Sequence, residues 1–518
     1  MQASTKGRRL TKAVMTGTAS PDVIVVGGGP AGSVLAWALA QRGIRATVLE
    51  RATFPREKVC GDYIVPSGLR ILKAMGALAN LDGPDRTPIT RSRIYMDSTV
   101  AFEGAMPYYE PVHGMPPHAA IIPRHELDTE LLARAAAAGA TVLQGCAVTA
   151  VRQDAGRMQV EFRRDGKTET LTAPLVIGAD GVESTVAKSL GMKRNDRRHI
   201  SIFRRVYVDG VDIDPREVTV WFDAEIYPGY GWMFPLGNGR ANVGVGILSE
   251  ACHRHDLSVP KAFIAAIERL RSRVPGCSGV RIASHPMGGV VKSYGGIGRN
   301  SFDGGLLIGD AGSFVDPITG EGITQGMESA LIAAETIADA LTLGRFDAET
   351  LSRFDSDARA YFDPSMRWLE LCATFLRNRH LREFSQRLLL RGLRQADRDP
   401  AFAHATGAAF GGLDMQPLAI AGQIGAAALR SLGGAVPHML VDLLLRRFGS
   451  SDGLVGDITA LRRGWTASHR DDPEWHRHWV ADTVRAAAHI DPASLTGQNQ
   501  RLRGRLPPQD GSTNSLRL

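Results

Sequence analysis

A glycine-rich turn lies between a short apolar run and an Ala- and Leu-rich segment near the start of the chain. The run DVIVV at 22–26 precedes GGGPAG at 27–32, and residues 31–42 have the composition of a helix. In such a turn the first glycine permits the tight strand-to-helix bend, the second lets backbone approach a pyrophosphate, and the third allows close helix–strand packing. These three roles fall on Gly27, Gly29 and Gly32. The pattern predicts a dinucleotide-binding βαβ unit.

A second short strand completes this unit. Residues 46–50 (ATVLE) end in Glu50, and an acidic residue at that place accepts hydrogen bonds from ribose hydroxyls. Arg51 follows it and is a further candidate cofactor contact. The helix N-terminus after the glycines supplies free N–H groups and a positive dipole end, which suit phosphates.

Two more buried strands are expected downstream, each followed by a short acidic motif. The strand at 175–178 leads into Ala179-Asp180-Gly181, and the strand at 306–309 leads into Asp310 and a long helix at 323–341. A stretch at 197–250 with few helical periods separates them. Rossmann-like elements therefore return after a sheet-rich domain, which predicts two interleaved domains.

In this order the three motifs resemble the flavoprotein superfamily of aromatic hydroxylases, squalene epoxidases and geranylgeranyl reductases. The resemblance implies that the carboxylate of Asp310 hydrogen-bonds the ribityl chain of FAD. It also implies that Asp180 lies near flavin and nicotinamide, and that Arg124, just before a helix expected at 125–138, contacts the flavin.

Three further segments are similar to the geranylgeranyl reductase group. They are PREKVCGD at 55–62, YGWMFP at 230–235, and Asp316-Pro317 followed by GEGI at 320–323, which contains Gly322. The resemblance covers about residues 21–345 and implies an α/β fold in which a Rossmann-like FAD-binding domain is interleaved with a sheet-rich substrate domain. The expected parts are an N-terminal extension (1–20), FAD-binding segments (21–196 and 291–345), the substrate domain (197–290), a helical C-terminal region (346–495) and a polar tail (496–518).

Two of these segments contain candidates for chemistry beyond cofactor binding. Cys60 precedes a glycine, so its thiol is either a proton donor beside the flavin or a small buried hydrophobe. Tyr230, Trp232 and Phe234 alternate, so on a strand they share one face. That face suits a polyprenyl chain or polyketide, while plain core packing is the alternative interpretation.

The predicted function is reduction of isolated C=C bonds in a polyprenyl substrate, such as a geranylgeranyl group or an isoprenoid quinone. FAD is the expected cofactor, and NAD(P)H or another electron donor is expected to bind only transiently. One alternative is a flavin-dependent monooxygenase, epoxidase or halogenase acting on a polyketide or other secondary metabolite. Halogenases carry Trp-x-Trp-x-Ile-Pro where this chain has YGWMFP, a departure that counts against halogenation but not oxygenation. A protein that uses its flavin structurally is the other alternative.

Composition limits the remaining partners and the location. The five cysteines are scattered and lack a Cys-x-x-Cys pair, which favours a reducing, cytoplasmic compartment and argues against a structural zinc site. No metal site is predicted. The net charge is +7, but clustered aromatics and basic repeats of a nucleic-acid module are not evident, so no nucleic-acid partner is expected. The oligomeric state stays open.

The C-terminal region contains a basic, leucine-rich segment. Six arginines lie within eighteen residues, and Leu443-Leu444-Leu445-Arg446-Arg447-Phe448 repeats the theme. The arginines are Arg377, Arg379, Arg382, Arg387, Arg391 and Arg394. On one helix they predict either a peripheral membrane contact or a helix packed on the FAD domain with a solvated basic face.

Overall fold

The computed structural model describes residues 20–81, 86–97, 99–105, 116–192, 197–295, 298–387, 390 and 454–490. Most of the expected N-terminal extension and the whole expected tail lie outside the described residues, as do Arg391, Arg394 and the cluster at 443–448.

A six-stranded sheet forms the centre of the first domain, in the order β18-β19-β11-β1-β2-β7. All pairs are parallel except β18 with β19. The strands are β1 (Val23–Val26), β2 (Ala46–Glu50), β7 (Thr141–Gln144), β11 (Leu175–Gly178), β18 (Ser301–Phe302) and β19 (Gly305–Leu307). The strand expected at 306–309 is shorter than predicted, because Gly309 takes φ +56° and begins a 3₁₀ turn.

Different layers cover the two faces of this sheet, which explains the continuous apolar runs of its strands. Three helices, α1 (Pro30–Ala40), α4 (Arg124–Ala137) and α8 (Ile323–Leu343), pack together with one face. A three-stranded antiparallel sheet of β8 (Ala147–Asp154), β9 (Arg157–Arg164) and β10 (Lys167–Ala173) covers the other. Small elements complete this domain: β3 (Tyr63–Ile64), α2 (Pro66–Ala74), α3 (Leu78–Leu81), β6 (Ala120–Ile121) and α5 (Thr185–Ser189).

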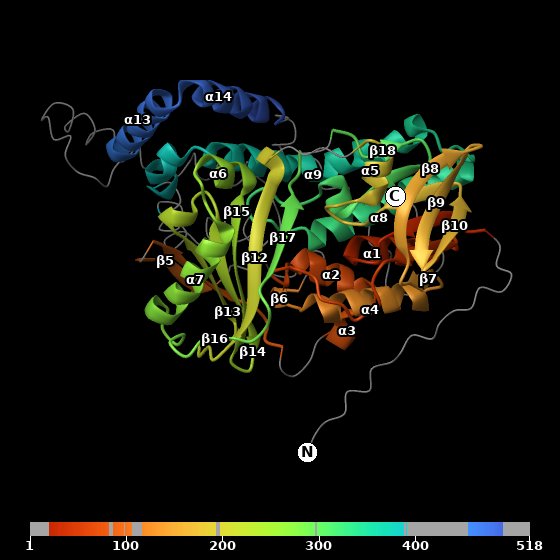
Figure 1. The fold of residues 1–518 in the computed structure, drawn as a ribbon, viewed down its shortest axis with the longest axis horizontal. Coiled ribbons are helices and arrows are strands. Elements are labelled where there is room, and N and C mark those ends of the chain that lie inside the picture. The colour runs from red at the N-terminus through yellow and green to blue at the C-terminus, as the bar shows by residue number, and fades with distance from the viewer. Residues whose placement is uncertain are drawn as a thin grey trace, which may run out of the picture.

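An eight-stranded sheet forms the second domain, at the opposite end of the molecule from β8–β10 (Figure 1). Its strands are β4 (Arg91–Met96), β5 (Thr99–Ala105), β12 (Ile200–Asp209), β13 (Glu217–Phe222), β14 (Tyr230–Gly237), β15 (Arg240–Leu248), β16 (Arg281–Ile282) and β17 (Met287–Lys292). The helix α7 (Val259–Arg273) packs on this sheet and closes a separate apolar core. Strands β4 and β5, which lie within the first expected FAD-binding segment, join this sheet through β13.

The C-terminal region is helical where it is described. The helix α9 (Ala348–Leu376) packs on α8, and α14 (Pro473–Ala488) packs on α9. The helix α13 (Leu454–Asp471) lies against a 3₁₀ turn at Arg379–Leu381, and α6 (Ser249–Arg254) lies below this helical layer in Figure 1. Among the described residues, none of the helices combines the length and the apolarity that crossing a bilayer requires.

The expectation of one continuous basic helix from Arg377 onward is wrong. The helix α9 ends at Leu376, and Asn378 leaves the helical conformation with φ −82° and ψ 96°. Arg377 is buried and donates to Glu250 and Asp482, at 2.9 and 3.4 Å. Arg382 pairs with Asp97, and Arg387 with Glu383 at 3.2 Å. These charges hold the segment against the protein instead of forming a free basic face.

Candidate FAD and substrate site

The glycine turn after β1 has the geometry that a pyrophosphate requires. Gly27 has φ +102°, and a Cβ there would lie 2.4 Å from the carbonyl oxygen of Ala179. A Cβ at Gly32 would lie 1.9 Å from the Gly27 oxygen, so this helix–strand contact also excludes a side chain. At Gly29 the only atom near a Cβ would be Nη2 of Arg56, at 3.8 Å. The space before the α1 N-terminus is therefore open and bordered by a guanidinium group.

Glu50 lies at the end of β2, as predicted, and its carboxylate is tied to the glycine turn. Its Oε2 accepts from the Gly28 N–H at 2.7 Å, and its Oε1 accepts from the Ala52 N–H at 2.8 Å. Each carboxylate oxygen has a second lone pair, so a ribose hydroxyl can still bind there. Arg51, beside it, is exposed. Ribose binding by Glu50 and cofactor contact by Arg51 stay predictions.

A buried carboxylate on α4 orients two arginines next to this turn. Asp128 accepts from Arg124 through both oxygens, at 2.7 and 2.8 Å, and pairs with Arg56 at 2.9 Å. Sequence reasoning found Arg124 but missed Arg56 and Asp128. The i,i+4 spacing of Arg124 and Asp128 on a helix was the signal that could have found the carboxylate.

Asp310 lies where several cations converge. Burial raises the pKa of its carboxyl, and the charges of Lys58, Arg124 and Lys292 oppose that rise. A Cβ at Gly322 would lie 3.2 Å from Asp310 Oδ1, so this glycine allows the α8 N-terminus to approach the carboxylate. The structure therefore brings together Asp310, Arg124 and Gly322, which are up to 198 positions apart in the chain.

Asp180 has a different environment. Its Oδ2 accepts from the N–H groups of Thr185 and Val186, at 2.6 and 3.2 Å, at the first turn of α5. Its Oδ1 is buried without a partner among the described residues. The carboxylate therefore supports the local turn, and its proximity to β1 comes from the pairing of Val26 with Gly178.

We expect Asp310→Ala to weaken FAD binding more than Asp180→Ala. A lost hydrogen bond to a charged group costs about 1.5–3 kcal/mol, or roughly tenfold to a hundredfold in affinity. Asp180→Ala should instead lower the melting temperature of the apoprotein, because α5 loses its cap. Titration of the apoproteins with FAD measures both dissociation constants, and equal or reversed effects would contradict these roles.

The turn at Cys60 packs directly on the aromatic face of β14. A Cβ at Gly61 would lie 3.1 Å from Cε2 of Phe234 and 3.6 Å from Nε1 of Trp232. The Cys60 thiol is half-buried, and its sulfur accepts from the Asp62 N–H at 3.3 Å. Burial raises the pKa of this thiol, while the Arg124 charge lowers it. The two segments singled out in the sequence therefore meet at one place.

The alternating aromatics of β14 form a continuous row. Ring centroids are 5.9 Å apart for Tyr230 and Trp232, 6.1 Å for Trp232 and Phe234, and 5.4 Å for Phe234 and Tyr63. Tyr230 donates its hydroxyl hydrogen to the Thr319 carbonyl, which joins the row to the loop before Gly322. Trp232 is only 5% exposed, so it belongs to the packed interior as well as to this face.

Comparison with known proteins agrees with this geometry. The family model of the FAD binding domain matches residues 20–367, which contain the glycine turn, Asp180 and Asp310. A menaquinone reductase of Mycobacterium tuberculosis is 34% identical over 335 residues, which are 63% of this chain and 78% of that protein. The chain belongs to the geranylgeranyl reductase family of FAD-dependent oxidoreductases.

Other members and solved structures support this assignment. Digeranylgeranylglycerophospholipid reductase 1 of Methanopyrus kandleri is 33% identical over 327 residues, covering 62% of this chain and 81% of that protein. The fold matches a geranylgeranyl bacteriochlorophyll reductase-like protein of Thermoplasma acidophilum, with a TM-score of 0.59, 23% identity and coverage of 69% and 88%. It also matches a flavin-dependent halogenase, with a TM-score of 0.58, 23% identity and coverage of 70% and 66%. FAD fits the site, because Gly29 faces open space beside Arg56.

Proposed function

We propose that this FAD-dependent oxidoreductase reduces isolated C=C bonds of a polyprenyl substrate, with NAD(P)H or another donor as its source of electrons. The observation that carries the proposal is the contact between the Cys60–Asp62 turn and the aromatic face of Trp232 and Phe234. A weak acid, an apolar wall and the FAD-binding turns thus converge. The names of the relatives, a menaquinone reductase and digeranylgeranylglycerophospholipid reductases, support the substrate class.

In the proposed reaction, reduced FAD supplies a hydride to one carbon of the double bond. The Cys60 thiol gives its proton to the other carbon, so the bond gains two hydrogens and the sulfur is left as a thiolate. The Arg124 charge and the Asp62 N–H, 3.3 Å from the sulfur, stabilise that thiolate. A proton from solvent then restores the thiol. Tyr230, Trp232 and Phe234 hold the isoprenoid chain and keep water from the reacting carbons.

The decisive experiment compares product masses. The enzyme is photoreduced without oxygen and mixed with a menaquinone or with digeranylgeranylglycerophospholipid, while the flavin spectrum is recorded. We expect the flavin to reoxidise and the product to gain two hydrogens. A product that gains one oxygen, formed only in air, would establish a monooxygenase instead. Turnover with no redox change of the flavin would establish a structural role for FAD.

Phe234→Ala is expected to lower kcat/KM for a polyprenyl substrate about tenfold, because about 1.5 kcal/mol or more of apolar contact is lost. FAD content should not change. Phe234 is half-buried, whereas removing the buried Trp232 would itself cost about 3–5 kcal/mol of stability. Phe375→Ala is the matched control, because Phe375 is also half-buried but packs on Phe384 and Trp479 in the C-terminal region. Equal kcat/KM values in the two variants would exclude Phe234 from the wall.

Peripheral contact with a membrane stays a prediction. The ion pairs of Arg377, Arg382 and Arg387 support the alternative of a packed segment, and Arg379 is the exposed arginine of the described part of that segment. Sedimentation with anionic and neutral liposomes across a salt series tests this contact. Binding to anionic liposomes at low salt only would support it.

A further inference from the structure

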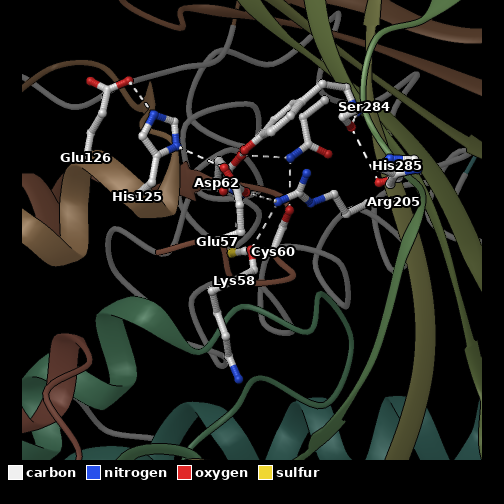
Figure 2. Close-up of polar contacts among 11 residues, drawn as sticks. Glu57, Lys58, Cys60, Asp62, His125, Glu126, Arg205, Ser284 and His285 are labelled. Atoms are coloured by element: carbon white, nitrogen blue, oxygen red, sulfur yellow. Dashed lines mark hydrogen bonds and ion pairs between the residues drawn. The ribbon is translucent and has the colours of Figure 1, made fainter. Parts of the chain in front are cut away.

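Asp62 is a fully buried acidic residue that the proposed chemistry does not consume. Its exposed fraction is 0%. Its Oδ2 accepts two hydrogen bonds, from the Tyr207 hydroxyl at 2.7 Å and from Nδ2 of Asn242 at 2.8 Å. Tyr207 and Asn242 are directly opposite each other on β12 and β15, so one carboxylate oxygen spans two paired strands of the second domain. Figure 2 shows these contacts converging on Asp62.

Asn242 extends this contact to the proposed chemistry. Its Nδ2 also donates to the Cys60 carbonyl at 2.9 Å, and its Oδ1 accepts from Nε1 of Trp232 at 3.1 Å. The side chain of Asn242 therefore links both ends of the Cys60–Asp62 turn to the aromatic wall. Asp62 itself has φ +64°, a left-handed conformation that a fixed side chain helps to hold.

The segment before this turn is tied to both domains. Glu57 lies 3.5 Å from Nδ1 of His125 on α4 and 3.1 Å from Nη2 of Arg205 on β12. Arg205 also donates to the Lys58 carbonyl at 3.1 Å. In Figure 2 the Lys58 side chain extends away from these groups. Residues 57–62 thus form a strap across the domain boundary, and Asp62 fixes the end that carries the thiol.

The position of Asp62 is costly unless its hydrogen bonds are needed. A buried carboxylate without full hydrogen bonding destabilises a fold, and Oδ1 of Asp62 has no partner among the described residues. Burial raises the pKa of this carboxyl to about 6, against the hydrogen bonds from Tyr207 and Asn242 and the charges of Arg205 and Arg124. The surroundings therefore favour an acceptor oxygen more clearly than a negative charge.

We propose that Asp62 is a positioning residue, whose hydrogen bonds to Tyr207 and Asn242 hold the Cys60 thiol in register with Trp232. The role of the thiol as proton donor rests on the proposed function, but the clamp itself does not. Asp62→Asn retains one acceptor oxygen for both donors and removes the charge. Asp62→Ala removes both bonds.

The first readout is independent of turnover. Alkylation of Cys60 by iodoacetamide is followed at a fixed, mildly alkaline pH, and the Cys60 peptide is quantified by mass spectrometry so that the other four cysteines do not interfere. We expect Asp62→Ala to raise the rate about tenfold or more, because two hydrogen bonds to a carboxylate no longer restrain the turn. Asp62→Asn should stay within about threefold of the wild type, since its oxygen accepts from the same donors.

The second readout is single-turnover reduction of a menaquinone by the photoreduced holoenzyme. Asp62→Ala should lower the rate about tenfold or more with little change in KM, and Asp62→Asn should restore most of it. Tyr207→Phe removes one of the two donated bonds and should fall between them, which keeps the proposal testable if Asp62→Ala does not fold. An unchanged Cys60 reactivity in both Asp62→Ala and Tyr207→Phe would overturn the proposal. So would an Asp62→Asn protein as reactive as Asp62→Ala, because charge would then matter more than hydrogen bonding. Altered alkylation without any menaquinone reduction would refute the proposed function and leave the clamp intact.

Discussion

Gly29→Val should yield a folded protein that no longer retains FAD. The backbone at Gly29 has φ −72° and ψ −173°, an extended conformation that any residue adopts. A Cβ there would approach only the flexible end of Arg56, at 3.8 Å, so the apoprotein has room for the new side chain. The same space is where the pyrophosphate must approach the α1 N-terminus. We expect a loss of FAD affinity of about a hundredfold or more, which is about 2.7 kcal/mol.

The measurement is the flavin-to-protein absorbance ratio after purification, followed by FAD titration of the apoprotein. Gly288→Val is the matched control, because Gly288 lies on β17 and a Cβ there would meet only the Phe203 carbonyl, at 3.7 Å. The control should keep its flavin. A yellow Gly29→Val protein with wild-type affinity would refute the assignment of this turn to the pyrophosphate.

The parts of the fold that sequence reasoning predicted are those specified by neighbouring residues. The apolar run before Gly27, the glycine spacing and the acidic end of β2 all act within about thirty residues, which is the length of a βαβ unit. The resemblance added Asp310 and Asp180, and the structure brings Asp310 next to Arg124. Local turn chemistry and short motifs were sufficient for these elements.

Long-range pairing explains what the sequence could not predict. Asp62 and Asn242 are 180 positions apart, and neither belongs to a motif that specifies its partner. Register decides the contact, since Asn242 faces Asp62 only because β15 pairs with β12 at Tyr207. The membership of β4 in the second sheet depends likewise on its pairing with β13.

The basic C-terminal segment illustrates the same limit. Its charges and leucines have the spacing of an amphipathic helix, but Arg377 finds Glu250 and Asp482, which are 127 and 105 positions away. Periodicity shows which residues can share a face. It does not show whether that face meets solvent, lipid or a carboxylate from another element, and here the described arginines pair with acidic side chains.

Cys60→Ala is expected to lower the rate of C=C reduction by about a hundredfold or more, the usual contribution of a positioned general acid. FAD content and melting temperature should remain close to the wild-type values, because the thiol is small and half-buried. Cys146→Ala is the control: Cys146 is a buried free cysteine in the core beneath β8–β10 and is not part of the site. Its turnover should match that of the wild type.

The pH dependence gives the sharper test of Cys60. The thiol must be protonated to act, and burial raises its pKa above the ordinary value despite the opposing Arg124 charge. The wild-type rate should therefore be flat through neutral pH and fall only as the pH rises through that elevated pKa. In Cys60→Ala the residual rate should lack this alkaline limb, because the titrating group is gone. If the limb persists in the variant, or if the rate is unchanged, another group delivers the proton and Cys60 serves only as packing against Phe234 and Trp232.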